Sequence, residues 1–278
     1  MNLNNLKHMY FLGIGGIGMS ALARYFHKAG VVVSGYDRVR TPLTKKLSEE
    51  GIHIVFKDDT DLLPEKIDLV VVTPAIPKDH KQYQYLSMKE IPMLKRSEVL
   101  GIITRDKTTI AVAGTHGKTS VSSILAHILN HAGIKVSAFV GGIMKNYDSN
   151  VILSDDPEVL VVEADEYDRS FLKLHPTMSV VTAIDPDHLD VYGSKVSLIE
   201  AFKEFTKKIE GVGHRVVNEK IDKDLIHTSS FLRYGFEKTT DFQITNYIIK
   251  NHQYEFDATG PNGFSLRNVR FRIPGRFN

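Results

Sequence analysis

Apolar runs and amphipathic helical stretches alternate along the first part of the chain. Residues 68–73 (DLVVVT) form a continuous apolar run, which is typical of a parallel strand covered on both faces. Residues 19–28 and 42–50 have the periodicity of helices, and Gly30 and Gly51 follow them as stops. Strands are predicted at 9–12, 31–34, 52–56 and 68–73. Alternating units of this kind favour a parallel sheet with helices on both faces.

The same pattern begins again after the polar segment 104–108 (TRDKT), where we place a domain boundary. Strands are predicted at 109–113, 159–163 and 178–184, and helices at 118–132 and 194–209. Residues 241–273 differ, because short alternating segments broken by Asn, Gly and Pro predict an antiparallel meander. The pattern therefore predicts two α/β domains, at residues 1–106 and 107–278.

Composition and charge narrow the class of protein. A length of 278 residues suits two domains, and 42% hydrophobic with 24% charged residues is ordinary for a globular chain. A net charge of +2 does not favour nucleic acid or an anionic membrane as a partner. The chain has no cysteine, which excludes disulfides, thiolate metal ligands and a cysteine nucleophile. No membrane-length apolar run or signal-peptide core is present, so we expect a cytoplasmic protein.

The first glycine-rich motif, GIGGIG at residues 13–18, lies between a predicted strand and a predicted helix. Gly13, Gly15 and Gly18 match the dinucleotide-binding pattern, and Asp37 follows at the expected distance. An NAD-binding Rossmann domain is one interpretation. A second interpretation is a site for another nucleotide, because glycines at a helix N-terminus let the backbone approach the pyrophosphate of any nucleotide. A third is a tight turn that binds no ligand.

The second glycine-rich motif, AVAGTHGKTS at residues 111–120, also joins a strand to a helix. It is shorter than the usual phosphate-binding loop, because Val112 stands five positions before Gly117 where that pattern has glycine. Lys118 and Thr119 still supply a phosphate-binding cation and a Mg²⁺-binding hydroxyl. The motif predicts an ATP site, so the fold class is a Rossmann-like parallel-sheet domain followed by a P-loop-type ATPase domain with an antiparallel β extension.

Acidic residues follow two of the predicted central strands. They lie in VVEADEYDRSF (161–171) and DPDHLD (185–190), and in open α/β sheets the carboxyl ends of strands face the ligand crevice. Carboxylates beside a phosphate-binding loop suit a Mg²⁺–ATP site, although most of them can equally be solvated loop residues. His188 is either a site residue or an ordinary surface histidine, and His116 either a spacer or a donor to a second substrate's anionic group.

Four motifs in this order, GIGGIGMSALARY, GTHGKTS, EADEYDRSF and DPDHLDVYG, resemble the Mur ligases of peptidoglycan synthesis, most of all their alanine-adding branch. The resemblance covers the N-terminal and central domains of the family. It implies that the first motif binds the UDP part of UDP-N-acetylmuramate rather than NAD, and that the second binds ATP. The lactyl carboxylate then attacks the γ-phosphate to give an acyl phosphate, from which the amine of L-alanine displaces phosphate.

Carried over onto this sequence, the resemblance implies catalytic roles for Lys118, Glu163 and His188. Thr119 would bind one Mg²⁺, and Glu163 and His188 a second, with Mn²⁺ as a substitute. The residues expected to contact ATP are Gly114, Thr115, His116, Gly117, Lys118, Thr119, Ser120 and Asn278. Those expected to contact UDP-N-acetylmuramate are Gly13, Gly15, Gly16, Ile17, Gly18, Met19, Ser20, Asp37, Thr73, Pro74, Ala75, Arg96, His116, Gly141 and Gly142 (in an expected FVGG turn) and Ser170.

The sequence departs from the family pattern near its end. Phe277 stands where the family commonly has histidine, although Asn278 matches, and the family's third domain, which would bind the amino acid, does not follow. We expect residues 274–278 to be a boundary within a longer protein. From residues 1–278 alone we expect binding of UDP-N-acetylmuramate, weaker binding of ATP and little or no ligase turnover.

Three rival functions compete with this interpretation, and each explains fewer of the motifs. A murein-recycling ligase that adds an intact tripeptide to the same UDP-sugar is compatible with EADEYD. A non-catalytic UDP-sugar-binding module would need the first motif but not Lys118, Thr119, Glu163 and His188. An NAD-dependent oxidoreductase would leave the second motif unexplained.

Overall fold

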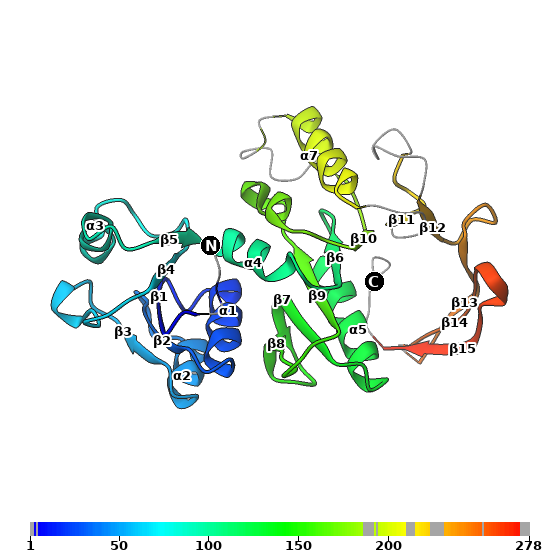
Figure 1. The fold of residues 1–278 in the computed structure, drawn as a ribbon. Coiled ribbons are helices and arrows are strands. Elements are labelled where there is room, and N and C mark those ends of the chain that lie inside the picture. The colour runs from blue at the N-terminus through cyan, green and yellow to red at the C-terminus, as the bar shows by residue number, and fades with distance from the viewer. Residues whose placement is uncertain are drawn as a thin grey trace.

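The computed structural model describes residues 3, 5–185, 192, 194–209, 215–222, 231–251 and 253–272. Within these residues the chain forms two α/β units in succession, each built on its own sheet (Figure 1). The predicted fold class is confirmed: a parallel sheet comes first, and a larger mixed sheet with antiparallel strands follows.

The first sheet has five parallel strands in the order β3-β2-β1-β4-β5. Its strands are β1 (His8–Leu12), β2 (Val32–Tyr36), β3 (His53–Val55), β4 (Leu69–Val72) and β5 (Met93–Lys95). Its helices are α1 (Ile17–Lys28), α2 (Pro42–Glu49), α3 (Lys81–Met88) and α4 (Arg96–Thr104), with the 3-10 turn η1 (Thr60–Leu62). The strand order reverses at β1, so the loops that follow β1 and β4 open at the point where such sheets bind ligands.

The second sheet has ten strands in the order β15-β14-β13-β12-β11-β10-β6-β9-β7-β8. Its strands are β6 (Thr109–Ala113), β7 (Val136–Met144), β8 (Ser149–Ile152), β9 (Val159–Ala164), β10 (Met178–Val181), β11 (Arg215–Asn218), β12 (Leu232–Gly235), β13 (Phe242–Lys250), β14 (Gln253–Thr259) and β15 (Ser265–Phe271). The accompanying helices are α5 (Lys118–His131) and α7 (Lys195–Lys207), with η2 (Tyr167–Lys173) and η4 (Pro261–Gly263). The predicted meander is confirmed, because β13, β14 and β15 pair antiparallel.

Several elements were not predicted from the hydrophobic pattern. These are α3, α4 and the short strand β5 in the first unit, and β7, β8, β11 and β12 in the second. The expected FVGG turn was wrong, since residues 139–142 lie inside β7. A register shift between Phe139 and Met144 in the pairing with β8 accommodates the two glycines there. β10 ends at Val181 rather than residue 184, because the next residues leave the sheet to bind the loop after β6.

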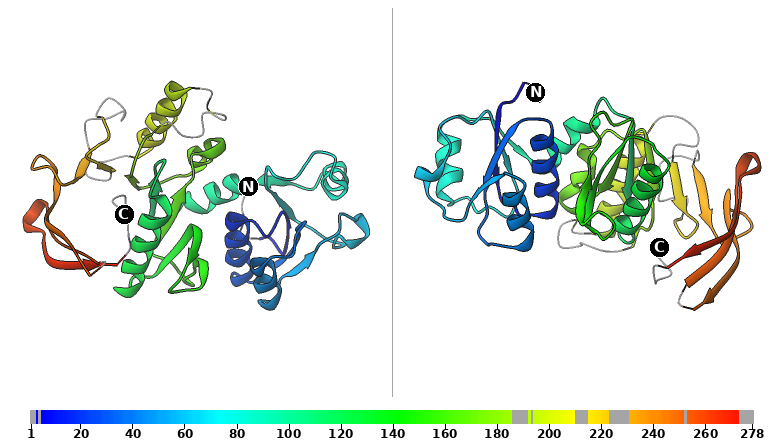
Figure 2. Two further views of the ribbon diagram at one scale, coloured as in Figure 1. Left: turned by 180° about the vertical axis from the view of Figure 1, so that it is seen from behind. Right: turned by 90° about the horizontal axis from the view of Figure 1, so that it is seen from below.

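The two units pack directly on one another. Helix α1 contacts β7 and β8, and α4 contacts η2 (Figure 2). One apolar cluster contains buried side chains of both units, among them Leu22 and Phe26 from α1 with Phe139 and Val151 from the second sheet. In the part of the chain that the structure describes, no helix has the length and apolarity needed to cross a membrane.

Candidate active site

The first loop, residues 13–18, is held against the ends of β2 and β4. The backbone N–H groups of Gly13 and Ile14 both donate to the Tyr36 carbonyl, at 2.8 and 3.0 Å. Gly13 has φ +86°, and a Cβ there would lie 2.4 Å from Thr73 Cγ2. Helix α1 then begins after Gly16, which provides no side-chain cap. No side chain of the loop therefore caps the first N–H groups of α1, which leaves them available to bind an anion.

Two charged side chains border this loop. The Asp37 carboxylate accepts from the Gly15 N–H at 2.7 Å, so it shapes the loop from the end of β2. Arg96, the first residue of α4, extends over Gly18, where a Cβ would lie 2.6 Å from Arg96 Cδ. Its guanidinium is 3.5 Å from Asp165 Oδ2. A cation from α4 thus lies beside the N-terminus of α1.

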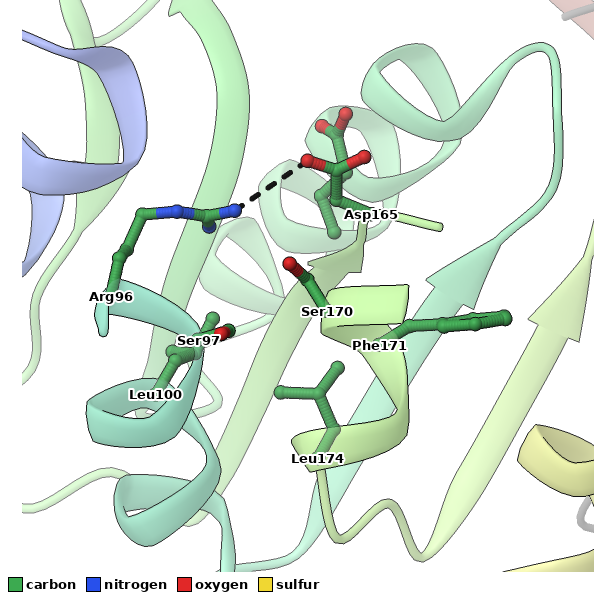
Figure 3. Close-up of a pocket in the computed structure, with 8 residues that line it drawn as sticks. Arg96, Ser97, Leu100, Asp165, Ser170, Phe171 and Leu174 are labelled. Carbon is green, nitrogen blue, oxygen red and sulfur yellow. Dashed lines mark hydrogen bonds and ion pairs between the residues drawn. The ribbon is translucent and has the colours of Figure 1, made fainter. Parts of the chain in front are cut away.

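A cavity of about 340 Å³ lies between the two units. Residues of the first loop and of α1 form one wall, and β7 with the end of β9 forms the other. The lining residues are Gly16, Ile17, Gly18, Met19, Ala21, Leu22, Thr73, Arg96, Leu100, Phe139, Val140, Gly141, Glu163 and Asp165. A smaller recess beside it brings Ser170 next to Arg96 and Asp165 (Figure 3).

The second loop, residues 114–119, is closed by the segment that follows β10. The Thr115 N–H donates to the Ala183 carbonyl at 3.0 Å, and Thr115 Oγ1 accepts from the Asp185 N–H at 3.0 Å. The Thr182 hydroxyl donates to the carbonyls of Ala113 and His116. Helix α5 begins after Gly117, which has φ +81° and no side-chain cap. This is the geometry that the motif predicted: a rigid turn that ends at an uncapped helix N-terminus.

Gly114 should be the least replaceable residue of this loop. It has φ +137°, and a Cβ would lie 2.2 Å from Thr182 Oγ1 and 2.9 Å from the Ala183 nitrogen. We expect Gly114→Ala to lower the free energy of unfolding by about 2–4 kcal/mol, because strain and overpacking add. Gly133→Ala is the matched control, since Gly133 has φ +81° with open space around it and should cost only about 1 kcal/mol. Equal losses in urea denaturation of the two variants would contradict this.

Lys118 is bound by a buried carboxylate. Its Nζ donates to the Gly114 carbonyl at 2.7 Å and lies 2.9 and 2.8 Å from the two carboxylate oxygens of Glu166. The Glu166 side chain is fully buried, and this burial raises the pKa of the carboxyl above its ordinary value, against the effect of Lys118. The sequence placed Glu166 among the acidic strand-end residues but indicated no role for it. Only the turn after β9 brings it to the lysine.

Glu163, at the end of β9, is bonded to the second loop and lines the cavity that begins at the first loop. Thr119 Oγ1 donates to Glu163 Oε1 at 2.9 Å, and the Gly141 N–H donates to Oε2 at 2.6 Å. A Cβ on Gly141 would lie 2.5 Å from Oε1, so only glycine leaves room for this carboxylate. Gly142 lies beside Thr119 in the same way, with a Cβ position 3.1 Å from its Cγ2. A carboxylate and a hydroxyl are the hard oxygen ligands that fit Mg²⁺.

The remaining predicted residues have different positions. Thr73 lines the cavity, whereas Pro74 and Ala75 are exposed beside it. Ser20 is buried away from the cavity and donates to the Ile17 carbonyl. His116 is exposed, with Nε2 3.7 Å from Asp185 Oδ2, and Ser120 lies on the first turn of α5. His188 and Asn278 lie outside the described residues, within which no three His, Asp or Glu side chains gather as a metal site.

Two uncapped helix N-termini follow glycine-rich loops, one on each sheet, and Glu163 bonds to the second loop and lines the cavity that begins at the first. The fold is that of an α/β protein of two units, each with a glycine-rich loop whose geometry suits an anionic ligand. The chain belongs to the Mur ligase family: residues 8–108 match the model described as Mur ligase family, catalytic domain, and residues 112–278 match the Mur ligase middle domain.

Two of the most similar curated relatives are named as ligases. The chain is 45% identical to UDP-N-acetylmuramate–L-alanine ligase of Christiangramia forsetii and 46% identical to that of Flavobacterium psychrophilum, in both cases over 100% of its length. It spans 61% of each of these relatives.

Solved structures show the same fold. UDP-N-acetylmuramate-alanine ligase of Thermotoga maritima is 26% identical with a TM-score of 0.83, and the match covers 97% of this chain and 61% of that one. UDP-N-acetylmuramate:L-alanyl-gamma-D-glutamyl-meso-diaminopimelate ligase of Neisseria meningitides has a TM-score of 0.84 at 24% identity, covering 98% of this chain and 89% of that one. The second match supports the fold alone.

Proposed function

We propose that the chain binds UDP-N-acetylmuramate at the first loop and Mg²⁺–ATP at the second. It would form the two-domain part of an enzyme that ligates L-alanine to the lactyl carboxylate of that sugar through an acyl phosphate, in peptidoglycan precursor synthesis. The observation that carries the proposal is the position of Glu163. Its carboxylate is bonded to Thr119 of the second loop and also lines the cavity that begins at the first loop.

The residues present suit a phosphoryl transfer between two bound ligands. The first loop and Arg96 would hold the diphosphate of the UDP-sugar, with the sugar extending along the cavity toward Gly141 and Glu163. Lys118 would neutralise the transferring phosphoryl group, and Thr119 and Glu163 would hold Mg²⁺. Bound Mg²⁺ supplies charge neutralisation for the phosphates. Catalysis would then depend on positioning and electrostatics rather than on a nucleophile of the protein.

The relatives favour L-alanine over a tripeptide as the group that is added. Each of the two curated relatives above is named for L-alanine, whereas the tripeptide ligase matches at an identity that supports only the fold. An NAD-dependent oxidoreductase is disfavoured because it gives no role to Lys118, Thr119 or Glu163.

Isothermal titration of this chain with UDP-N-acetylmuramate tests the proposal, with NADH as the control ligand. We expect binding of the UDP-sugar in the micromolar range and none of NADH, because the cavity continues from the first loop toward Glu163. Arg96→Ala should weaken the UDP-sugar by about tenfold, as one charge-assisted phosphate contact is lost. Binding of NADH without the UDP-sugar would contradict the proposal, and so would failure of the UDP-sugar to bind.

A further inference from the structure

We infer that Asn150 is a positioning residue for the UDP-sugar site, although it does not line the cavity. It lies on β8, the edge strand of the second sheet, and its side chain is fully buried. It bonds to the first unit, so it fixes one wall of the cavity against the other. The identity of the ligand rests on the proposed function, whereas the role of Asn150 in fixing the two units against one another rests on its own hydrogen bonds.

Asn150 makes three hydrogen bonds to α1. Its Oδ1 accepts from Arg24 Nη1 at 2.6 Å, and its Nδ2 donates to the Ile17 carbonyl at 2.6 Å and to Ser20 Oγ at 3.1 Å. The amide thus uses its carbonyl and its amino group on a single helix. Buried hydrogen bonds of this kind resist movement, because breaking them would leave polar atoms unpaired away from water.

Arg24 is itself held in place. Its Nε and Nη2 bond to the two carboxylate oxygens of Glu50 at 2.7 and 2.8 Å, and it is only 7% exposed. A bidentate pair fixes the plane of the guanidinium, so Nη1 is presented to Asn150 in a set direction. We call Glu50, Arg24 and Asn150 together the Asn150 bridge. It runs from the end of α2 through α1 to β8.

The Asn150 bridge connects the two walls of the cavity. On one side, Ile17 is the first residue of α1 and lines the cavity with Gly16 and Gly18. On the other side, β8 pairs with β7 at Phe139 and Val151, and β7 continues into Gly141. Loss of the bridge would let α1 shift relative to Gly141 and Glu163, while the second loop, which lies wholly in the second unit, keeps its geometry.

Two neighbouring contacts join the same units at the surface and serve as controls. Lys46 Nζ lies 2.6 Å from Asp148 Oδ2, and Lys28 Nζ lies 3.0 Å from Asp155 Oδ1. The aspartates are 85% and 92% exposed, so these pairs are worth little in water. If any contact between the units sufficed, Lys46→Ala would act like a change at Asn150.

The first test compares the affinities of the two ligands in Asn150→Ala and Lys46→Ala. We expect Asn150→Ala to weaken UDP-N-acetylmuramate by about tenfold and leave a Mg²⁺-bound non-hydrolysable ATP analogue unchanged, since only the site between the units is disturbed. Lys46→Ala should change neither. Asn150→Asp keeps the acceptor for Arg24 but sets a carboxylate oxygen against the Ile17 carbonyl in place of the amide donor, so it should also weaken the UDP-sugar and serves as a second variant if the alanine variant fails to fold. An unchanged UDP-sugar affinity, or an equal loss for both ligands, would overturn the inference.

The second test needs no ligand. The chain has no cysteine, so Met88→Cys on α3 and Glu204→Cys on α7, both exposed, introduce one spin label in each unit. Electron–electron distance measurements should give a narrow distribution in the labelled parent and in Lys46→Ala, and a broader or shifted one in Asn150→Ala. The same distribution in Asn150→Ala would overturn the bridge whatever the ligand. If the parent failed to bind the UDP-sugar, the proposed function would fall while this measurement still decided the role of Asn150.

Discussion

Lys118→Met is expected to weaken Mg²⁺–ATP by at least about 100-fold, because charge-assisted bonds to phosphate are worth about 1.5–3 kcal/mol each. The same change should lower the free energy of unfolding by about 3 kcal/mol at neutral pH, since it removes the cation 2.8 Å from the buried Glu166 carboxylate. Titration with a non-hydrolysable analogue and urea denaturation measure the two effects. An affinity within a few-fold of the parent would contradict the role of Lys118.

The stability effect should depend on pH with a definite sign. Burial already raises the pKa of Glu166 above its ordinary value of 4.5, and loss of Lys118 would raise it further. A carboxyl that binds protons more tightly when folded favours the folded state in acid, so the free energy of unfolding falls as pH rises from 4.5 through the raised pKa. The deficit of Lys118→Met should therefore grow as pH rises above 4.5 and shrink as pH falls toward that value.

The double variant Lys118→Met with Glu166→Gln separates the two effects. Glutamine keeps the shape of Glu166 and carries no charge, so the double variant should recover stability to within about 1 kcal/mol of the parent. It should also lose the pH dependence. Nucleotide affinity should stay as low as in the single variant, because neither side chain supplies a cation. Recovery of ATP binding in the double variant would show that stability, and not the lysine, limits binding.

Glu163→Gln is the second change with a large expected effect. Glutamine can still accept from the Gly141 N–H and bond to Thr119, so the local fold should persist. Glutamine is a poor ligand for Mg²⁺. We therefore expect the affinity for the Mg²⁺-bound analogue to fall by about 100-fold, which is the upper end of the losses usual for changes around metal sites. The affinity for the analogue with EDTA should stay near that of the parent.

The matched control is Asp156→Asn, which removes a carboxylate that is 86% exposed. It has the same change in net charge and should leave both affinities unaltered. UDP alone, without the sugar, should bind Glu163→Gln as it binds the parent, since the first loop is unchanged. A Glu163→Gln variant whose affinity still rises with Mg²⁺ as in the parent would show that the ion is held elsewhere.

Both glycine loops could be identified from the sequence because each is a local feature. In each loop a strand, glycines and a helix follow one another within a short stretch, with Lys118 added in the second, and the chain needs no distant partner to form such a turn. The apolar run 68–73 was recognisable as a parallel strand for the same reason, and it became β4. The family resemblance, confirmed by the two family models, rested on the same local motifs.

Strands β7 and β8 could not be predicted as readily. β7 carries Gly141 and Gly142, which weaken any intrinsic preference for a strand, and its form depends on pairing with β9 on one side and β8 on the other. Asn150 gave no signal at all, since a lone asparagine in a polar stretch reads as a turn residue. Its burial comes from α1, which approaches from the other unit.

The sequence by itself determined that this protein has two glycine-rich strand-to-helix turns on two α/β units, because short-range periodicity and turn chemistry are written in neighbouring residues. The tertiary structure decided which groups meet: the Glu163 carboxylate with the Gly141 N–H and the Thr119 hydroxyl, Lys118 with Glu166, and Asn150 with Arg24. Each of these contacts joins segments that are far apart in the chain or lie in different elements. Their meeting depends on strand order and on how the two units pack, and neither is encoded in any single stretch of residues.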